Sequence, residues 1–120
     1  REMESLVASN GDDSGTLRIE HDLDAVLGEI DAIMMLRVQF ERHDGASIDE
    51  HYTQRFGLNP GRAARLRADA PVLHPGPINR GIELDPEVAD GPRSLILDQV
   101  TCGVAVRMAV IQGLLRGLGR

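Results

Sequence analysis

The apolar residues of the chain fall into short continuous runs separated by segments with helical spacing, which predicts a mixed α/β domain. Residues 32–36 form an uninterrupted apolar run bounded by charged residues, as expected for a strand buried on both faces of a parallel sheet. Residues 71–74 form a shorter run that ends in a Pro-Gly-Pro sequence, where proline prevents further ladder pairing. The alternation over residues 17–19 predicts one more short strand.

Helices are predicted in the segments between these strands. One is expected over residues 22–29, because Asp22 is a favourable N-cap residue. Another is expected over residues 48–56, where Gly57 ends it. An Asn-Pro pair, which supplies an N-cap and a first-turn proline, precedes a third predicted helix over residues 60–68.

The longest predicted helix runs from residue 92 to about residue 117. It carries one apolar stripe at spacings of three and four residues, formed by Ile96, Val100, Val104, Met108, Ile111, Leu115 and Leu118. Residues 78–91 before it are expected to be irregular. The order of elements predicts an α/β fold with an open parallel sheet flanked by helices, ending in this long C-terminal helix.

The charge balance excludes several classes of partner. The 120 residues carry 13 basic and 19 acidic side chains, a formal net charge of -6, which repels phosphate backbones and anionic headgroups. We therefore expect neither nucleic acid nor a membrane as partner. Residues 95–118 are the most apolar region, but we do not expect them to span a membrane because charged and polar residues interrupt them. All the basic residues are arginine, so these residues supply no lysine for a Schiff base or a phosphate loop.

Two candidate substrate-binding residues follow the apolar run at residues 32–36. Arg37 comes directly after it, so its guanidinium can reach the crevice at the carboxyl edge of the sheet and bind a carboxylate with two hydrogen bonds. Gln39 would share the same side of an extended backbone and add an amide that orients a polar substrate. The alternative is that Arg37 pairs with a structural carboxylate such as Glu41.

The turn after the second run offers backbone groups. Pro75 and Pro77 restrict the chain around Gly76, so the carbonyl oxygens of these three residues can accept hydrogen bonds from an amine or a carbamoyl group. We expect Gly76 to act through its backbone and to tolerate alanine. The alternative is a plain turn that terminates the strand.

Other polar residues carry weaker signals. The four histidines lack metal-ligand spacing, so no metal site is expected. We expect an acidic cluster to face solvent, formed by Glu83, Asp85, Glu87 and Asp90. We expect the same of an arginine cluster, formed by Arg62, Arg65 and Arg67. Cys102, the single cysteine, fits a reducing compartment and is expected to be buried in the long helix.

Three stretches carry a specific resemblance. Residues 34–42 (MMLRVQFER), 73–84 (LHPGPINRGIEL) and 89–110 (ADGPRSLILDQVTCGVAVRMAV) closely resemble the catalytic chain of bacterial aspartate carbamoyltransferase, in the same order and spacing. The similarity extends from about Thr16 to Leu115 and corresponds to the C-terminal part of that chain. It implies a partial Rossmann-like aspartate-binding domain.

The resemblance also implies an activity. Family members transfer the carbamoyl group of carbamoyl phosphate to the amine of L-aspartate in de novo pyrimidine biosynthesis, as cytoplasmic homotrimers without a metal or organic cofactor. The arginine that matches Arg37 holds the side-chain carboxylate of aspartate, and the glutamine that matches Gln39 helps to place the amino acid. Carbonyls of the turn at residues 75–77 contact the carbamoyl group and the attacking amine, and the segment matching residues 43–57 closes on the substrate. Gly76 and Arg37 disfavour the related ornithine carbamoyltransferase.

The family's carbamoyl-phosphate domain has no counterpart in these residues. We therefore expect residues 1–91 to be a partial aspartate-binding domain and residues 92–120 to be a helix that packs on that other domain. The chain is expected to be catalytically incomplete by itself. The alternative is a non-catalytic remnant or a separate piece that needs a partner chain.

Overall fold

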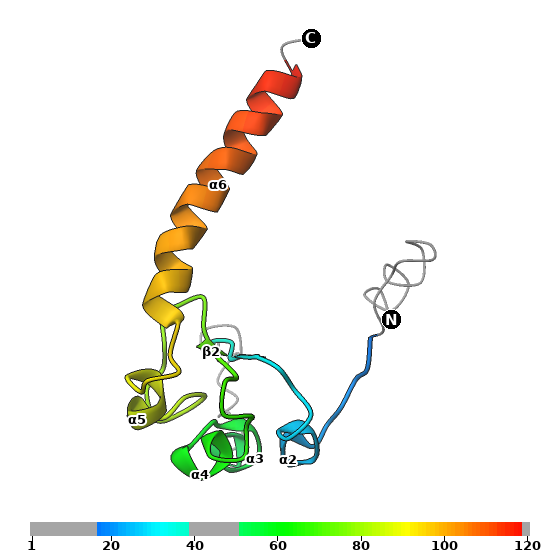
Figure 1. Cartoon of the computed structure of the whole chain (residues 1–120), viewed down its shortest axis with the longest axis vertical. Helices are drawn as coiled ribbons and strands as arrows, with labels where there is room; N and C mark the ends of the chain where they lie inside the picture. The colour runs from blue at the N-terminus through cyan, green and yellow to red at the C-terminus, as the bar shows by residue number, and fades with distance from the viewer. Residues whose placement is uncertain (1–16, 39–50, 119–120) are drawn as a thin grey trace, which may run out of the picture.

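The computed structural model describes residues 17–38 and 51–118. Its elements are, in chain order, α2 (Leu23–Val26), β1 (Ile33–Met34), α3 (Tyr52–Phe56), α4 (Pro60–Ala63), β2 (Val72–Leu73), α5 (Pro86–Ala89) and α6 (Ile96–Leu118). All elements but α6 gather in one compact region, and α6 extends away from it (Figure 1).

The two strands form a parallel sheet. Ile33 pairs with Val72 and Met34 with Leu73, and the Met35 N–H continues the ladder by donating to the Leu73 carbonyl at 2.9 Å. A parallel bridge between Val72 and Ser94 extends the pairing on the other side of β2. Helices connect and flank these strands, which confirms the predicted α/β class.

A small apolar core lies between the sheet and the short helices. Its members are Leu27, Ile33, Met35, Leu58, Ala63, Leu66, Ala70, Val72, Leu84, Val88, Ala89 and Ile96. Leu27, Leu58 and Leu84 are the largest fully buried apolar side chains, and a parallel bridge joins Leu58 to Leu84. The segment after α3 therefore packs against the segment before α5 in this core.

Two predicted helix caps are confirmed. The Asp22 side chain accepts a hydrogen bond from the Asp24 N–H at the start of α2. The Asn59 side chain accepts one from the Arg62 N–H, with Pro60 in the first turn of α4. Both contacts satisfy amide groups that would otherwise lack an intrahelical partner.

Several sequence predictions are wrong in detail. Residues 17–19 form no strand, because both apolar side chains are exposed and nothing in the described ranges pairs with them. Residues 86–89, predicted to be irregular, form α5 with Asp85 as its N-cap. Helix α4 ends at Ala63, because the amides of Arg65 and Leu66 donate to carbonyls only three residues back.

The strand at residues 32–36 is buried on one face only. Ile33 and Met35 lie in the core, whereas Met34 and Leu36 are exposed by 54% and 62%. The prediction of burial on both faces is therefore wrong for this chain by itself.

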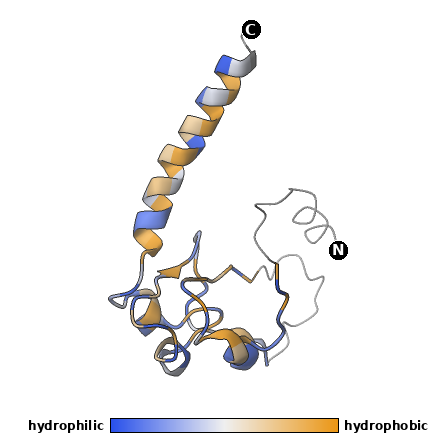
Figure 2. Cartoon of the chain, turned by 45° about the vertical axis from the view of Figure 1, so that its right-hand side comes forward, coloured by the Kyte–Doolittle hydropathy of each residue, from blue (hydrophilic) through white to orange (hydrophobic). Residues whose placement is uncertain are grey.

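Helix α6 is apolar on nearly all its sides and almost uncovered. At 23 residues it is roughly 35 Å long, and hydrophobic colour covers most of it (Figure 2). Ile96 is buried in the core, but the rest of the predicted stripe from Val100 to Leu115 is exposed, as are apolar residues off that stripe: Leu97, Val106, Val110 and Leu114. By length and composition alone, residues 96–117 would also suffice to cross a membrane. A helix that is apolar all round normally lies between neighbours.

Candidate functional site

The parallel pairing of β1 and β2 brings the two candidate segments to the same edge of the sheet. Arg37 is exposed and follows β1 by three residues, and the turn at residues 75–77 begins two residues after β2. Because parallel strands end on the same side, both segments leave the sheet at its carboxyl edge, where open α/β sheets bind ligands. Gln39 and the proposed ion-pair partner Glu41 lie outside the described residues.

A side chain that sequence reasoning missed joins the two segments. The Asn79 amide Nδ2 donates to the Val38 carbonyl at 2.9 Å, so the strand that presents Arg37 is tied to the chain just after the turn. Val38 and Asn79 are both half-buried. This hydrogen bond holds the two candidate binding segments next to each other.

The turn itself is held from below by His74. The imidazole Nδ1 of His74 accepts a hydrogen bond from the Gly76 N–H at 2.8 Å. The backbone N–H of His74 donates to Oε1 of Gln99, in the first turn of α6, at 2.9 Å. Pro75 and Pro77 are exposed, whereas His74 before them is buried. The turn is therefore accessible to solvent, and buried hydrogen bonds hold its first part in place.

Gly76 needs its freedom of conformation. Its φ of 67° lies in the left-handed region, where residues with a Cβ are strained. The expectation that alanine is tolerated here is therefore wrong on backbone grounds, although a Cβ would meet only Val100 Cγ2 at an ordinary 3.7 Å.

A buried acid–base pair lies under the turn. His74 and Glu83 are both 0% exposed, with 3.4 Å between His74 Nε2 and Glu83 Oε1. Glu83 Oε1 also accepts a hydrogen bond from the Asn79 N–H at 2.6 Å. The prediction that Glu83 faces solvent is wrong, because the core residue Leu84 next to it draws this segment inside.

The rest of the predicted acidic cluster does stay near the surface. Asp85 caps α5, Glu87 is exposed, and Asp90 forms an ion pair with Arg80 at 2.7 Å. The hydrogen bond from Arg80 lowers the pKa of Asp90 below its ordinary value.

Helix α3 approaches the same buried carboxylate. Burial raises the pKa of the Tyr52 hydroxyl, and the negative charge of Glu83 raises it further. Tyr52 lies near the end of the segment that the family resemblance expects to close on the substrate. The acid–base pair under the turn therefore also lies near the end of that segment.

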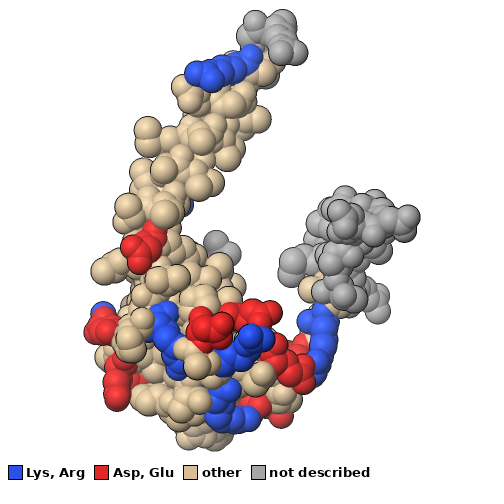
Figure 3. Space-filling view, viewed as in Figure 1, with Lys and Arg blue, Asp and Glu red and all other residues tan. Residues whose placement is uncertain are grey.

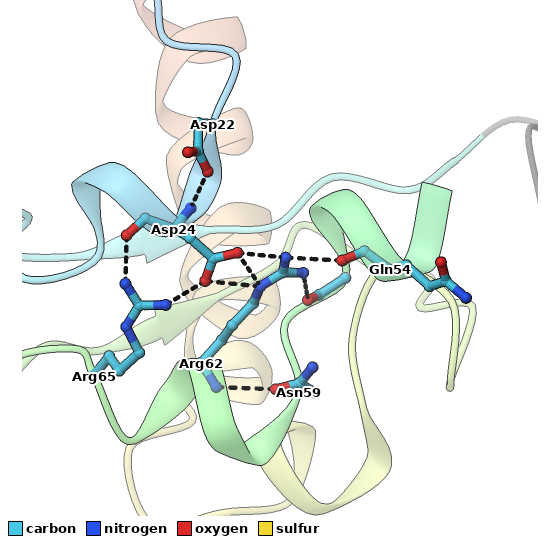
Figure 4. Close-up of polar contacts among 7 residues, drawn as sticks. Asp22, Asp24, Gln54, Asn59, Arg62 and Arg65 are labelled. Atoms are coloured by element: carbon cyan, nitrogen blue, oxygen red, sulfur yellow. Dashed lines mark hydrogen bonds and ion pairs between the residues drawn. The ribbon is translucent and has the colours of Figure 1, made fainter. Parts of the chain in front are cut away.

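The arginine cluster contains a structural ion pair rather than a solvated face. Arg62 donates to both carboxylate oxygens of Asp24 and to the Gly57 and Gln54 carbonyls, and Arg65 reaches Asp24 from the other side (Figure 4). Only 11% of the Arg62 side chain is exposed, so the prediction of a solvated face is wrong for this residue. The hydrogen bond from Arg62 lowers the pKa of Asp24.

The remaining candidates do not build a second site. Cys102 is exposed on α6, which corrects the expectation of a buried thiol. Within residues 17–38 and 51–118, no three histidine, cysteine or carboxylate side chains are grouped closely enough to hold a metal ion. Charged atoms concentrate on the compact region, whereas most of α6 is uncharged (Figure 3).

Known proteins share this sequence and arrangement. Residues 2–114 match the sequence model of the Asp/Orn binding domain of aspartate/ornithine carbamoyltransferases. The aspartate carbamoyltransferase catalytic subunit of Myxococcus xanthus is 54% identical over 96 residues, which are 78% of this chain and 32% of that protein. The corresponding subunit of Corynebacterium urealyticum is 52% identical over 103 residues, covering 84% of this chain and 33% of that protein.

Solved structures agree with these matches. Aspartate transcarbamoylase from Trypanosoma cruzi in complex with carbamoyl phosphate aligns with a TM-score of 0.63 at 29% identity, over 76% of this chain and 29% of that one. Ornithine carbamoyltransferase from Pyrococcus furiosus aligns with a TM-score of 0.56 at 25% identity, over 68% of this chain and 26% of that one. The chain thus spans about a third of the length of the curated relatives it matches. The chain belongs to the aspartate/ornithine carbamoyltransferase family, and its residues 2–114 correspond to the Asp/Orn binding domain of that family.

Proposed function

We propose that this chain is the amino-acid-binding part of an aspartate carbamoyltransferase, which transfers the carbamoyl group of carbamoyl phosphate to L-aspartate in pyrimidine biosynthesis. One observation carries the proposal: the parallel register of Ile33 with Val72 sends Arg37 and the turn at residues 75–77 to one edge of the sheet. A cation for a carboxylate and carbonyl oxygens for an amine are the two groups needed to orient an amino acid.

Each group has a defined role in this proposal. Arg37 binds the side-chain carboxylate of aspartate and Gln39 assists it. The carbonyls of Pro75, Gly76 and Pro77 accept hydrogen bonds from the attacking amine and the carbamoyl group. Holding both reactants in an attack geometry lowers the barrier without a titrating side chain in this portion or a cofactor.

The proposal assigns residues 1–91 to the aspartate-binding domain and residues 92–120 to a helix that packs on a carbamoyl-phosphate domain. Apolar side chains around most of α6, from Leu97 to Leu115, support a buried position in the complete enzyme. We further propose that the complete enzyme is a homotrimer of the cytoplasm. The match of the family's domain through residue 114 favours protein rather than lipid around α6.

Two observations favour aspartate over ornithine as the substrate. The curated relatives from Myxococcus xanthus and Corynebacterium urealyticum, 54% and 52% identical, are both named aspartate carbamoyltransferase catalytic subunit. Arg37 would repel the cationic side chain of ornithine, whereas it attracts the carboxylate of aspartate. The competing possibility is a non-catalytic remnant or a piece that functions only with a partner chain.

A chimeric enzyme tests the proposal. The N-terminal two thirds of the Myxococcus xanthus relative would be joined to this chain, with the unaltered relative as the matched control. We expect the chimera to form N-carbamoyl-aspartate and the 120-residue chain alone to show no turnover above the uncatalysed rate. A folded chimera without turnover would support the non-catalytic alternative, and turnover by the chain alone would overturn the domain assignment.

A further inference from the structure

His74 is fully buried directly beneath the candidate binding turn, yet the proposed reaction gives its side chain no role. Its imidazole is the hydrogen-bond partner of the central amide of that turn, at 2.8 Å from His74 Nδ1 to Gly76 N. The orientation of this amide determines where the Pro75 oxygen points, because both belong to the same peptide plane.

The hydrogen bond defines the tautomer of the imidazole. Because Nδ1 accepts from the Gly76 N–H, it carries no proton, and the ring proton of the neutral imidazole lies on Nε2. Nε2 faces Oε1 of Glu83 at 3.4 Å and has no hydrogen-bond partner within the described parts of the chain. The negative carboxylate favours a proton on the nitrogen that faces it.

The peptide plane transmits this orientation to the neighbouring carbonyl. The peptide bond between Pro75 and Gly76 is trans, so its N–H and C=O point in opposite directions. Since the Gly76 N–H points to the buried imidazole, the Pro75 oxygen points away from it. His74 thus aims the Pro75 carbonyl outward.

Glu83 is held in place by the segment that follows the turn. Its Oε1 accepts from the Asn79 N–H at 2.6 Å, while the side chain of Asn79 donates to the Val38 carbonyl at 2.9 Å. The Glu83 carboxylate is therefore connected, through Asn79, to the segment that carries Arg37. One network fixes both binding segments.

We propose that His74 is a positioning residue for carbamoyl transfer: its Nδ1 orients the Pro75–Gly76 peptide so that the Pro75 carbonyl receives the amine of the amino-acid substrate, and Glu83 keeps the ring proton on Nε2. This role rests on the function proposed above. His74 and Glu83 do not touch the substrate in it.

Kinetics of the chimeric enzyme test the role. His74→Leu removes the acceptor at similar volume, whereas His74→Asn supplies an oxygen that can bond the amide two residues ahead, as asparagine does in turns. We expect His74→Leu to lower kcat roughly tenfold to a hundredfold, the scale of a misplaced reacting group, with little change in KM for carbamoyl phosphate. His74→Asn should recover most of kcat, and the exposed His21→Asn serves as the control.

Two results would overturn the role. Equal kcat in His74→Leu and wild type would show that the acceptor does not matter. Equal losses of kcat in His74→Leu and His74→Asn, each matched by a loss of folded protein in urea unfolding, would reduce His74 to a packing residue.

A second readout separates this inference from the proposed function. Nitrogen NMR of the 15N-histidine-labelled 120-residue chain at neutral pH, with His74 signals assigned by their absence in His74→Leu, reports which ring nitrogen bears the proton. We expect a protonated Nε2 and a bare Nδ1, and a shift of this balance in Glu83→Gln. A proton on Nδ1 would overturn the inference even if the chimera is active. An inactive wild-type chimera with the expected tautomer would overturn the proposed function and leave the hydrogen-bond geometry confirmed.

Discussion

Asn79 bridges two segments that are 41 residues apart, because its Nδ2 donates to the Val38 carbonyl at 2.9 Å while its N–H donates to Glu83 Oε1 at 2.6 Å. We expect Asn79→Ala in the chimera to raise KM for aspartate severalfold, since Arg37 and the turn would lose their fixed separation. The unfolding midpoint should fall only modestly, because one backbone acceptor loses its partner. Asn79→Asp is the matched comparison, because it keeps the shape but loses the donor. Unchanged aspartate kinetics in both variants would contradict the bridging role.

Arg37 should select a dicarboxylic substrate. Arg37→Ala in the chimera removes a charge-assisted contact of roughly 1.5 to 3 kcal/mol, so kcat/KM for aspartate should fall at least tenfold. Arg37→Lys keeps the charge but loses the two-pronged geometry, and we expect an intermediate loss. Steady-state kinetics with each substrate varied would check this, with KM for carbamoyl phosphate as the internal control. A variant with wild-type use of aspartate would refute the assignment.

The backbone at Gly76 should resist substitution. Its φ of 67° predicts that Gly76→Ala destabilises the chain by about 1 kcal/mol. Gly28→Ala is the matched control, because a Cβ there meets nothing within 4 Å and its φ is not in the positive range. This control should be stabilised by about 0.4–1 kcal/mol through the unfolded state. Urea unfolding of both variants measures the difference, and a neutral Gly76→Ala would show that the turn relaxes freely.

Gly57 allows α3 to approach the segment before α5 closely. A Cβ at Gly57 would lie 2.6 Å from the Thr53 oxygen and 2.7 Å from the Ile82 oxygen, both backbone atoms that must then move. We expect Gly57→Ala to lower the free energy of unfolding by about 1 to 3 kcal/mol, as overpacking does. Gly113→Ala, where nothing lies within 4 Å, should instead gain up to about 1 kcal/mol from helix propensity. Equal stabilities in the two variants would contradict the close approach.

The ion pair of Asp24 should make stability depend on acid. The hydrogen bond from Arg62 lowers the pKa of Asp24 in the folded chain, so folding favours the charged carboxylate. Its contribution is complete above the unfolded pKa and is lost as pH falls through the folded pKa. Asp24→Asn should therefore be less stable than wild type at neutral pH, and the difference should shrink below about pH 4. Urea midpoints across this range measure it, with Asp69→Asn as the exposed control, and a constant difference would exclude the pair as the cause.

Local chemistry made much of the fold predictable. Asp22 and Asn59 announce helix starts because their side chains bond the amides two or three residues ahead, a contact that needs no tertiary structure. The prolines after β2 mark its end for an equally local reason. Strand length and burial were less predictable, because they depend on neighbours: Met34 and Leu36 look like core residues in the sequence but are exposed here.

The site was predicted in part. The sequence placed Arg37 and the turn at the carboxyl edge of the sheet, and the parallel register brings both segments there. The contact between His74 and Glu83 was missed, because eight residues of irregular chain separate them in the sequence. The only local hint was that apolar residues, Ile82 and Leu84, flank Glu83, which is unusual for a solvent-facing carboxylate.

The uncovered α6 also bears on how the complete enzyme would be made. A ribosome adds about 5–20 residues per second, so the 23 residues of α6 would take roughly one to five seconds to synthesise. In the proposed enzyme the carbamoyl-phosphate domain precedes this chain, so the surface that receives α6 is translated before α6 itself. The exposed apolar side chains of α6 would therefore emerge only after their docking surface has been synthesised, which shortens their exposure in the growing polypeptide.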